Sequence, residues 1–385
     1  MKKKIRFDLA YLLILINLIA LLWPVQLVGD DIAHQENLKI ISDYFNPIIF
    51  VINLCFFMLL KNSIILNKIV YTSILYSILL IISSLSGSEP IKNIFIAIFF
   101  TLCNVYMQNV YRYSYIKFPI NSFITKLLIF WATFPLIFLI KPDFRPLFID
   151  SFENSFHGFA GGRLEYGLWT TIAIILTFAY RENLGKSLAF ISLILMLSGL
   201  FLSQSRASFV SLAICLIYMI LSNKKYRGFL FKLNIIFMVS IVLVIALYSW
   251  QYFGRQNIFE LLNSTRLEIY TNYINQITIE NCFFGQGGMN SITLEDGTVT
   301  QAHNFLLQWL SNWGVFGLSG LMLFLYLFWK SLDSIYPRML FLALMFYSLT
   351  EPIQGTANFF GPVTLMIFFI MMGLQSDFVY EKVVL

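Results

Sequence analysis

Residues 187–221 read SLAFISLILMLSGLFLSQSRASFVSLAICLIYMIL, and this stretch decides the fold class. It contains two apolar runs, 187–202 and 207–221, which are separated by the four-residue polar break SQSR. Arg206 is the single charged residue in the stretch. Because a bilayer is crossed by about 20 mostly apolar residues in a helix, the two runs predict consecutive membrane-spanning helices joined by a very short turn.

The rest of the chain repeats this pattern. Of its 385 residues, 58% are hydrophobic and only 12% are charged, and the mean hydropathy is +0.76. Further apolar runs occupy residues 9–28, 47–60, 69–86, 93–109, 123–140, 164–180, 233–250, 315–329, 339–350 and 360–375. We therefore predict an all-α integral membrane protein, with residues 1–385 forming a single polytopic domain of about 12 transmembrane helices. The run 9–28 lacks a small-residue cleavage site after it and is interpreted as a retained first helix.

The distribution of charge predicts the orientation. If Met1 is cytoplasmic and the runs alternate, inside segments hold 18 of the 26 basic residues, and outside segments hold 15 of the 20 acidic ones. This asymmetry is the one that the positive-inside rule anticipates, so both termini are predicted to be cytoplasmic. The formal net charge of +6 is attributed to this orientation and not to binding of nucleic acid.

The longest outward segment is residues 251–314, between the ninth and tenth runs. Leu267, Tyr270, Ile274 and Ile277 recur in it at helical spacing, so we expect a periplasmic loop that is partly helical. The four cysteines predict neither a disulfide framework nor a zinc site, because three of them lie within apolar runs.

Two outward arginines are candidates for binding an anion. Arg206 lies at the outer membrane boundary, and Arg266 opens the helix expected in the loop. A guanidinium is a planar fork of donors that matches phosphate oxygens, and a helix N-terminus adds further donors. The alternatives are an interfacial Arg206 that only contacts lipid headgroups and an Arg266 that pairs with Glu268 on a solvated face.

His303, just before the tenth run, is a candidate proton acceptor, because histidine is the side chain best suited to accept a proton near neutral pH. The alternative is a structural histidine held by hydrogen bonds at the interface. Gly285, Gly287 and Gly288 precede it in a flexible turn, while Gly314 and Gly317 allow close helix packing. The sequence shows no metal-ligand cluster, Walker motif or paired-carboxylate signature, so no metal and no cofactor is predicted.

His303 and Asn304 are followed by the nine residues FLLQWLSNW, then Gly314, two residues and Gly317. This spacing is similar to the histidine pattern of the bacterial O-antigen ligase and O-antigen polymerase superfamily, which is His, Asn/Ser/Gln, nine residues, Gly, two residues, Gly/Thr/Tyr.

Two further segments carry the same resemblance. SQSRASFV is similar to the superfamily's T/S-x-S/T-R motif, which falls on Arg206. STRLEIY followed by FFGQGG is similar to its R-x-x-x-[WY] helix and downstream G-x-G, which fall on Arg266, Gly285 and Gly287. The motif-bearing, expected catalytic region is residues 195–320.

The resemblance implies an inverting, metal-independent glycosyltransferase of the bacterial inner membrane, with its active site on the periplasmic side. The implied donor is an undecaprenyl-diphosphate-linked glycan, whose diphosphate Arg206 and Arg266 would hold while His303 acts on the acceptor hydroxyl. Asn304, Gly285, Gly287 and Arg163 are further residues expected to contact substrate.

Three functions remain open on the sequence. An O-antigen ligase would join the glycan to a lipid A-core acceptor in lipopolysaccharide biosynthesis, and the complete histidine pattern favours it slightly. An O-antigen or capsule polymerase would join the glycan to a second lipid-linked glycan, which the Phe- and Ile-rich composition favours. A polysaccharide flippase or transporter is disfavoured, because no internal repeat is visible and the polar residues gather at one face.

Overall fold

The computed structural model describes residues 68–85, 120–140, 148–149, 155–160, 163–222, 265–286, 292–293, 299–300 and 302–349, with residues 367, 370, 371 and 374. The expected helices at 9–28, 47–60, 93–109 and 233–250 lie outside these residues. The number of spans therefore stays a prediction.

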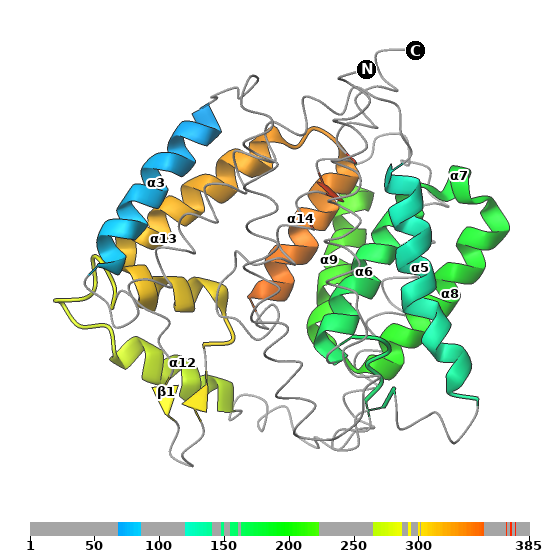
Figure 1. The fold of residues 1–385 in the computed structure, drawn as a ribbon, viewed down its shortest axis with the longest axis horizontal. Coiled ribbons are helices and arrows are strands. Elements are labelled where there is room, and N and C mark those ends of the chain that lie inside the picture. The colour runs from blue at the N-terminus through cyan, green and yellow to red at the C-terminus, as the bar shows by residue number, and fades with distance from the viewer. Residues whose placement is uncertain are drawn as a thin grey trace, which may run out of the picture.

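The described chain is mostly helical (Figure 1). Its helices are α3 (Lys68–Ser84), α5 (Ile120–Phe138), α6 (Arg163–Ala179), α7 (Arg181–Leu184), α8 (Lys186–Ser203), α9 (Arg206–Ser222), α12 (Thr265–Asn275), α13 (Phe305–Ser331) and α14 (Ile335–Ser348). The strands β1 (Ile292–Thr293) and β2 (Val299–Thr300) form a short antiparallel pair, with Ile292 opposite Thr300. The helix expected in the loop 251–314 is α12.

Two helices extend beyond the apolar runs that predicted them. α13 begins at Phe305, ten residues before the run 315–329, and it continues through a kink at Gly314, where φ is 65° and ψ is −166°. α14 begins at Ile335 and not at 339, because Pro337 falls within its first turn, where the missing amide proton costs nothing. Hydropathy marks the apolar part of a helix, whereas caps and turns set its ends.

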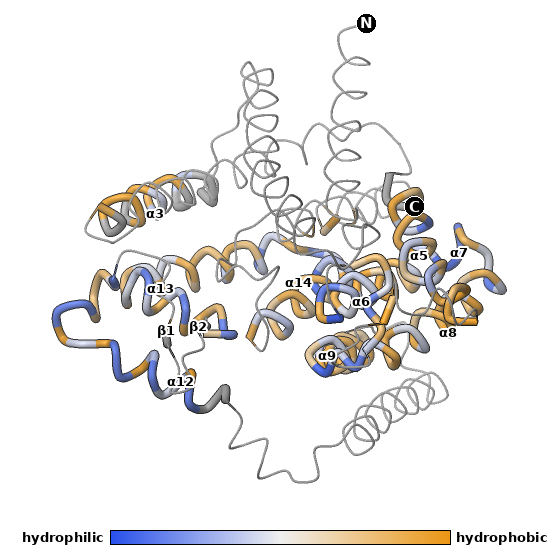
Figure 2. The backbone as a smooth tube through the Cα atoms, turned by 60° about the horizontal axis from the view of Figure 1, so that its bottom comes forward, coloured by the Kyte–Doolittle hydropathy of each residue, from blue (hydrophilic) through white to orange (hydrophobic). Residues whose placement is uncertain are grey.

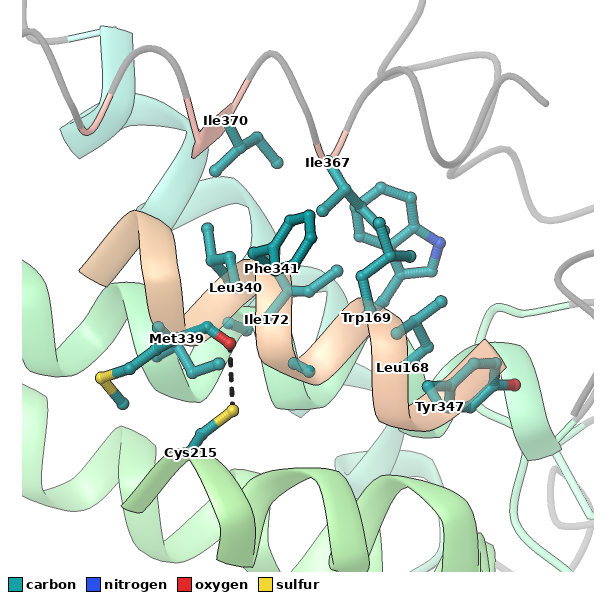
Figure 3. Close-up of a cluster of buried hydrophobic side chains, with 14 of the residues drawn as sticks. Leu168, Trp169, Ile172, Cys215, Met339, Leu340, Phe341, Tyr347, Ile367 and Ile370 are labelled. Atoms are coloured by element: carbon teal, nitrogen blue, oxygen red, sulfur yellow. Dashed lines mark hydrogen bonds between the residues drawn. The ribbon is translucent and has the colours of Figure 1, made fainter. Parts of the chain in front are cut away.

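α6 lies at the centre of the helix bundle. All of its residues from Tyr166 to Thr177 are buried, and it packs against α5, α8, α9 and α14. Figure 3 shows the layer where Trp169 and Ile172 of α6 approach α14 and α9. There the thiol of Cys215 donates a hydrogen bond to the carbonyl of Met339 at 3.0 Å.

Many large apolar side chains of the described helices are exposed, and these helices are largely hydrophobic along their length (Figure 2). On α8, for example, Phe190, Ile191 and Ile194 are exposed, whereas Ser192 and Ser203 are buried. Buried hydroxyls in other helices bond to the carbonyl four residues earlier, as Thr177 does to Ala173 at 2.8 Å. Large apolar side chains exposed on the outside of the bundle, with buried hydroxyls bonded to the carbonyls of their own helices, suit contact with lipid and not with water.

Two of the described helices are long and apolar enough to cross a membrane, namely α8 and α13. α9 and α14 are apolar as well, but they are shorter than 18 residues. The described part of the chain thus has the character of a helical membrane protein.

Candidate active site

A tight turn between α8 and α9 places Arg206 at the start of α9. Gln204 has a left-handed backbone with φ of 54°, and its amide donates to the carbonyl of Phe201 at 3.1 Å. Ser205 and Ser208 are fully buried, and their hydroxyl oxygens lie 2.7 Å apart. The polar break in the sequence is therefore a closely bonded turn, and Arg206 beside it is half-buried.

α6 begins at the same end of the bundle as α9. Gly167, one turn after Arg163 at the start of α6, lies directly against the turn, since a Cβ added there would be 2.5 Å from the Cβ of Ser205 and would overlap the hydroxyl of Ser208. The first turns of the two helices are therefore in contact. This contact places Arg163 and Arg206, each the first residue of its helix, at one end of the bundle.

His303 lies in the turn that leads into α13, and it is half-buried with a left-handed φ of 50°. Asn304 is the N-cap of the helix, and its Oδ1 accepts hydrogen bonds from the amides of Leu306 and Leu307 at 3.0 and 3.1 Å. Its Nδ2 donates to the carbonyl of Leu349, just after α14, at 3.1 Å. Asn304 therefore acts as a cap that fastens the His303 turn to the end of α14.

Gly285 and Gly314 belong to two separate motifs and meet in the structure. Both have positive φ, 72° and 65°, and a Cβ on Gly314 would be 2.6 Å from the amide nitrogen of Gly285. Next to this contact, the amide of Val315 donates to the carbonyl of Cys282 at 2.8 Å. The loop 278–286 is thereby docked into the kink of α13.

Gly317, the last glycine of the histidine pattern, fixes α13 against α3. Its carbonyl accepts hydrogen bonds from the hydroxyl of Tyr76 at 2.8 Å and from Nε1 of Trp309 at 3.1 Å. A Cβ at this position would overlap the Cβ of Trp313. The glycine leaves room for these indole rings.

Arg266 is the second residue of α12, and Gly287 lies outside the described residues. Ile269 and Tyr273 of α12 pack in one buried cluster with Ala302, which precedes α13, and with Leu307 in the first turn of α13. This packing places the helix that carries Arg266 beside the turn that carries His303.

Three polar residues near His303 were not singled out from the sequence. Tyr273, Gln308 and Asn312 are buried next to the turn. Oε1 of Gln308 accepts a hydrogen bond from the amide of Ala302 at 3.0 Å, and its Nε2 donates to Oδ1 of Asn312 at 3.0 Å. Burial raises the pKa of Tyr273 to about 12, although hydrogen bonding with Gln308 and the Ala302 backbone opposes the rise. The sequence did contain a signal for this cluster. Gln308 and Asn312 are two side-chain amides four residues apart, which places them on one face of an otherwise apolar helix.

The candidate residues are presented from one side of the bundle. In Figure 1 the first turns of α6, α9 and α13, the last turn of α14 and the whole of α12 lie on the lower side. α14 packs against both α9 and α13 and so connects the Arg163 and Arg206 pair to the His303 turn.

Comparison with known families gives a match over residues 191–322, to the family described as O-antigen ligase. This part of the chain is similar to an O-antigen ligase domain. The match extends from within α8 into α13 and includes all three motifs that predicted the superfamily, a resemblance that is thus confirmed. Arg163 lies outside the O-antigen ligase match. Comparisons with curated proteins and with solved structures give no match.

Proposed function

We propose that this O-antigen ligase family membrane protein transfers a glycan from undecaprenyl diphosphate to a lipid A-core acceptor at the periplasmic face of the bacterial inner membrane. The observation that supports the proposal is the placement of Arg206 and His303. Each lies at the N-terminal end of a helix, and both of these ends lie on the same side of the bundle. Both side chains are half-buried, at positions where helix N-termini supply further hydrogen-bond donors.

The reaction would proceed by direct displacement. The acceptor hydroxyl oxygen attacks the anomeric carbon of the donor sugar, the bond from that carbon to the diphosphate oxygen breaks, and the configuration inverts. The electron pair leaves with undecaprenyl diphosphate, and the imidazole of His303 takes the hydroxyl proton.

Arg206 and Arg266 are assigned to the leaving group. Negative charge develops on the diphosphate as the bond breaks, so fixed guanidinium groups there stabilise the transition state more than the ground state. Arg163 begins a helix that packs against α9 next to Arg206, which supports a role in contacting the glycan or the distal phosphate. Because the protein supplies this positive charge, the scheme needs no divalent cation.

The lipopolysaccharide of a deletion strain tests the function. Loss of long-chain polymer from lipid A-core, with polymer accumulating on the carrier lipid, is expected for the ligase. Core bearing a single repeat unit would instead indicate the polymerase, in which a second lipid-linked glycan is the acceptor. Lipid-linked repeats confined to the cytoplasmic leaflet would indicate a transporter and overturn the assignment to transfer.

A further inference from the structure

The turn that carries His303 is fixed from both sides. On the C-terminal side, Asn304 bonds to the first turn of α13 and to the end of α14. On the N-terminal side, the amide of Ala302 donates to Oε1 of Gln308 at 3.0 Å. His303 lies between these two anchored neighbours with a left-handed φ of 50°, which costs a non-glycine residue energy and persists only where the surroundings impose it.

Gln308 is placed to impose this conformation. It is 1% exposed, and its backbone amide also donates to the carbonyl of Asn304 at 2.9 Å. The residue therefore contacts both neighbours of His303, Ala302 through its side chain and Asn304 through its backbone. Its Nε2 is oriented by Oδ1 of Asn312 one turn further along α13, so the amide plane is set and Oε1 faces Ala302.

Tyr273 extends the connection to α12. It is fully buried and hydrogen-bonds with the Gln308 side chain and the Ala302 backbone. Burial raises the pKa of its hydroxyl to about 12, further above physiological pH than in an ordinary tyrosine, so Tyr273 holds its bonds without introducing charge. α12 is the helix that carries Arg266.

We propose that Gln308 is the positioning residue that holds the His303 turn in its left-handed conformation, and that Tyr273 couples this turn to the α12 helix of Arg266. The proposal rests on the proposed function in one respect, that His303 acts as the base. Neither Gln308 nor Tyr273 touches substrate in this scheme. Gln308 and Tyr273 set the direction of the His303 imidazole. Through Tyr273, α12 and the His303 turn move as one unit.

The test uses full-length protein purified in detergent and compares Gln308→Leu, Gln308→Glu and Tyr273→Phe with the unchanged chain. Leu removes the side-chain bonds to Ala302, Asn312 and Tyr273, whereas Glu keeps an oxygen that accepts from the Ala302 amide. Leu310→Ala is the matched control, because Leu310 is a half-buried residue of the same turn of α13 that takes no part in these hydrogen bonds. Tyr273→Phe removes a single hydroxyl and keeps the test usable if Gln308→Leu fails to fold.

The first readout does not need activity. Diethylpyrocarbonate acylates exposed imidazoles, and peptide mass spectrometry resolves the three histidines of the chain. Gln308→Leu should raise the acylation rate of His303 by about tenfold, because the loss of a buried hydrogen bond makes local opening of the turn more frequent by about that factor. Gln308→Glu should restore most of the protection, and Leu310→Ala should leave the rate of His303 unchanged. Equal His303 rates in folded Gln308→Leu, folded Tyr273→Phe and the unchanged chain would overturn the proposal.

The second readout is transfer. A misplaced base lowers turnover, so Gln308→Leu should lose about 100-fold in kcat with the donor KM unchanged. A purely structural role would instead lower the amount and melting temperature of the protein, at unchanged kcat per folded molecule. If the unchanged chain shows no transfer, the proposed function fails, while the acylation rates still decide the positioning role.

Discussion

The backbone of Gly314, in the middle of α13, lies directly against the backbone of Gly285 in the preceding loop: a Cβ on Gly314 would be 2.6 Å from the amide nitrogen of Gly285. Both residues have positive φ. The G-x-G segment and the histidine pattern, which look like independent motifs in the sequence, are thus the two halves of one contact. It docks the loop onto the helix whose first turn follows His303.

Gly314→Ala should unfold this region, because alanine at φ of 65° is strained and its Cβ would also overlap backbone atoms that cannot move aside. A backbone at φ of 65° and ψ of −166° is adopted almost only by glycine, and it alone costs another residue about 1–3 kcal/mol. The steric overlap adds to this cost. The melting temperature of the purified protein should therefore fall by clearly more than the backbone conformation alone would cause.

Gly185→Ala is the matched control for that measurement. Gly185, between α7 and α8, also has a positive φ, 83°, but a Cβ there would have no atom within 4 Å. It should show the conformational cost alone. Equal losses of melting temperature in the two variants would mean that the contact between Gly285 and Gly314 does not stabilise the loop.

The sequence predicted the helices α8 and α9 better than it predicted the kink of α13 and its contact with the preceding loop. The runs 187–202 and 207–221 became α8 and α9 within a few residues, because apolar composition is what a buried or lipid-facing helix needs. Gly314 was expected to allow close packing between helices, but its close neighbour is the backbone of Phe283 and Gly285 in the preceding loop. Nothing in the sequence showed that helix continues on both sides of Gly314 while its own φ is 65°. That kink depends on the loop docked against it.

The buried polar cluster beside His303 could not be predicted either, because it also depends on a contact between segments that are distant in the sequence. Gln308 and Asn312 stand out as amides in an apolar helix, which indicates that each needs a partner. The partner of Gln308 on α12, Tyr273, is 35 positions away and belongs to a helix whose packing no local pattern specifies. The placement of Arg206 at the start of α9, by contrast, followed from the short polar break alone.

Arg206→Lys should weaken use of the donor although the charge is kept, because an ammonium group lacks the planar fork that binds phosphate oxygens in pairs. Loss of one charge-assisted bond corresponds to about a tenfold to hundredfold fall in kcat/KM. Steady-state kinetics with lipid-linked donor measure it. Arg181→Lys, at the exposed start of α7, is the control and should match the unchanged chain. An Arg206→Lys enzyme with full kcat/KM would remove Arg206 from the diphosphate site.

The orientation predicts which cysteines an impermeant thiol reagent can reach. In a Cys282→Ser background, Asn290→Cys in the segment 251–314 should be labelled in cells with a permeabilised outer membrane. Asp333→Cys, in the exposed turn between α13 and α14, should be labelled only after the inner membrane is opened. The reverse pattern would invert the topology and place His303 on the cytoplasmic side.

Transfer should survive removal of divalent metal, because guanidinium groups supply the charge that stabilises the leaving diphosphate. Purified protein treated with EDTA is expected to keep its kcat, and added magnesium should not raise it. If turnover is lost in EDTA and restored by magnesium, the arginine scheme is wrong, and Glu165 and Glu268 become the first residues to test as ligands.

His303→Ala should separate chemistry from binding. General-base assistance typically contributes about 10² to 10⁴ in rate, so kcat should fall by that factor, while donor affinity, which depends on the arginines, stays the same. The acid limb of the pH–rate profile should also disappear, because a protonated imidazole cannot accept the hydroxyl proton and the variant has no imidazole to protonate. His34→Ala, in the acidic segment 29–46, is the control and should keep both the rate and the acid limb. A His303→Ala protein that binds donor poorly but turns it over at the normal rate would assign this histidine to the substrate and leave the base to be found elsewhere.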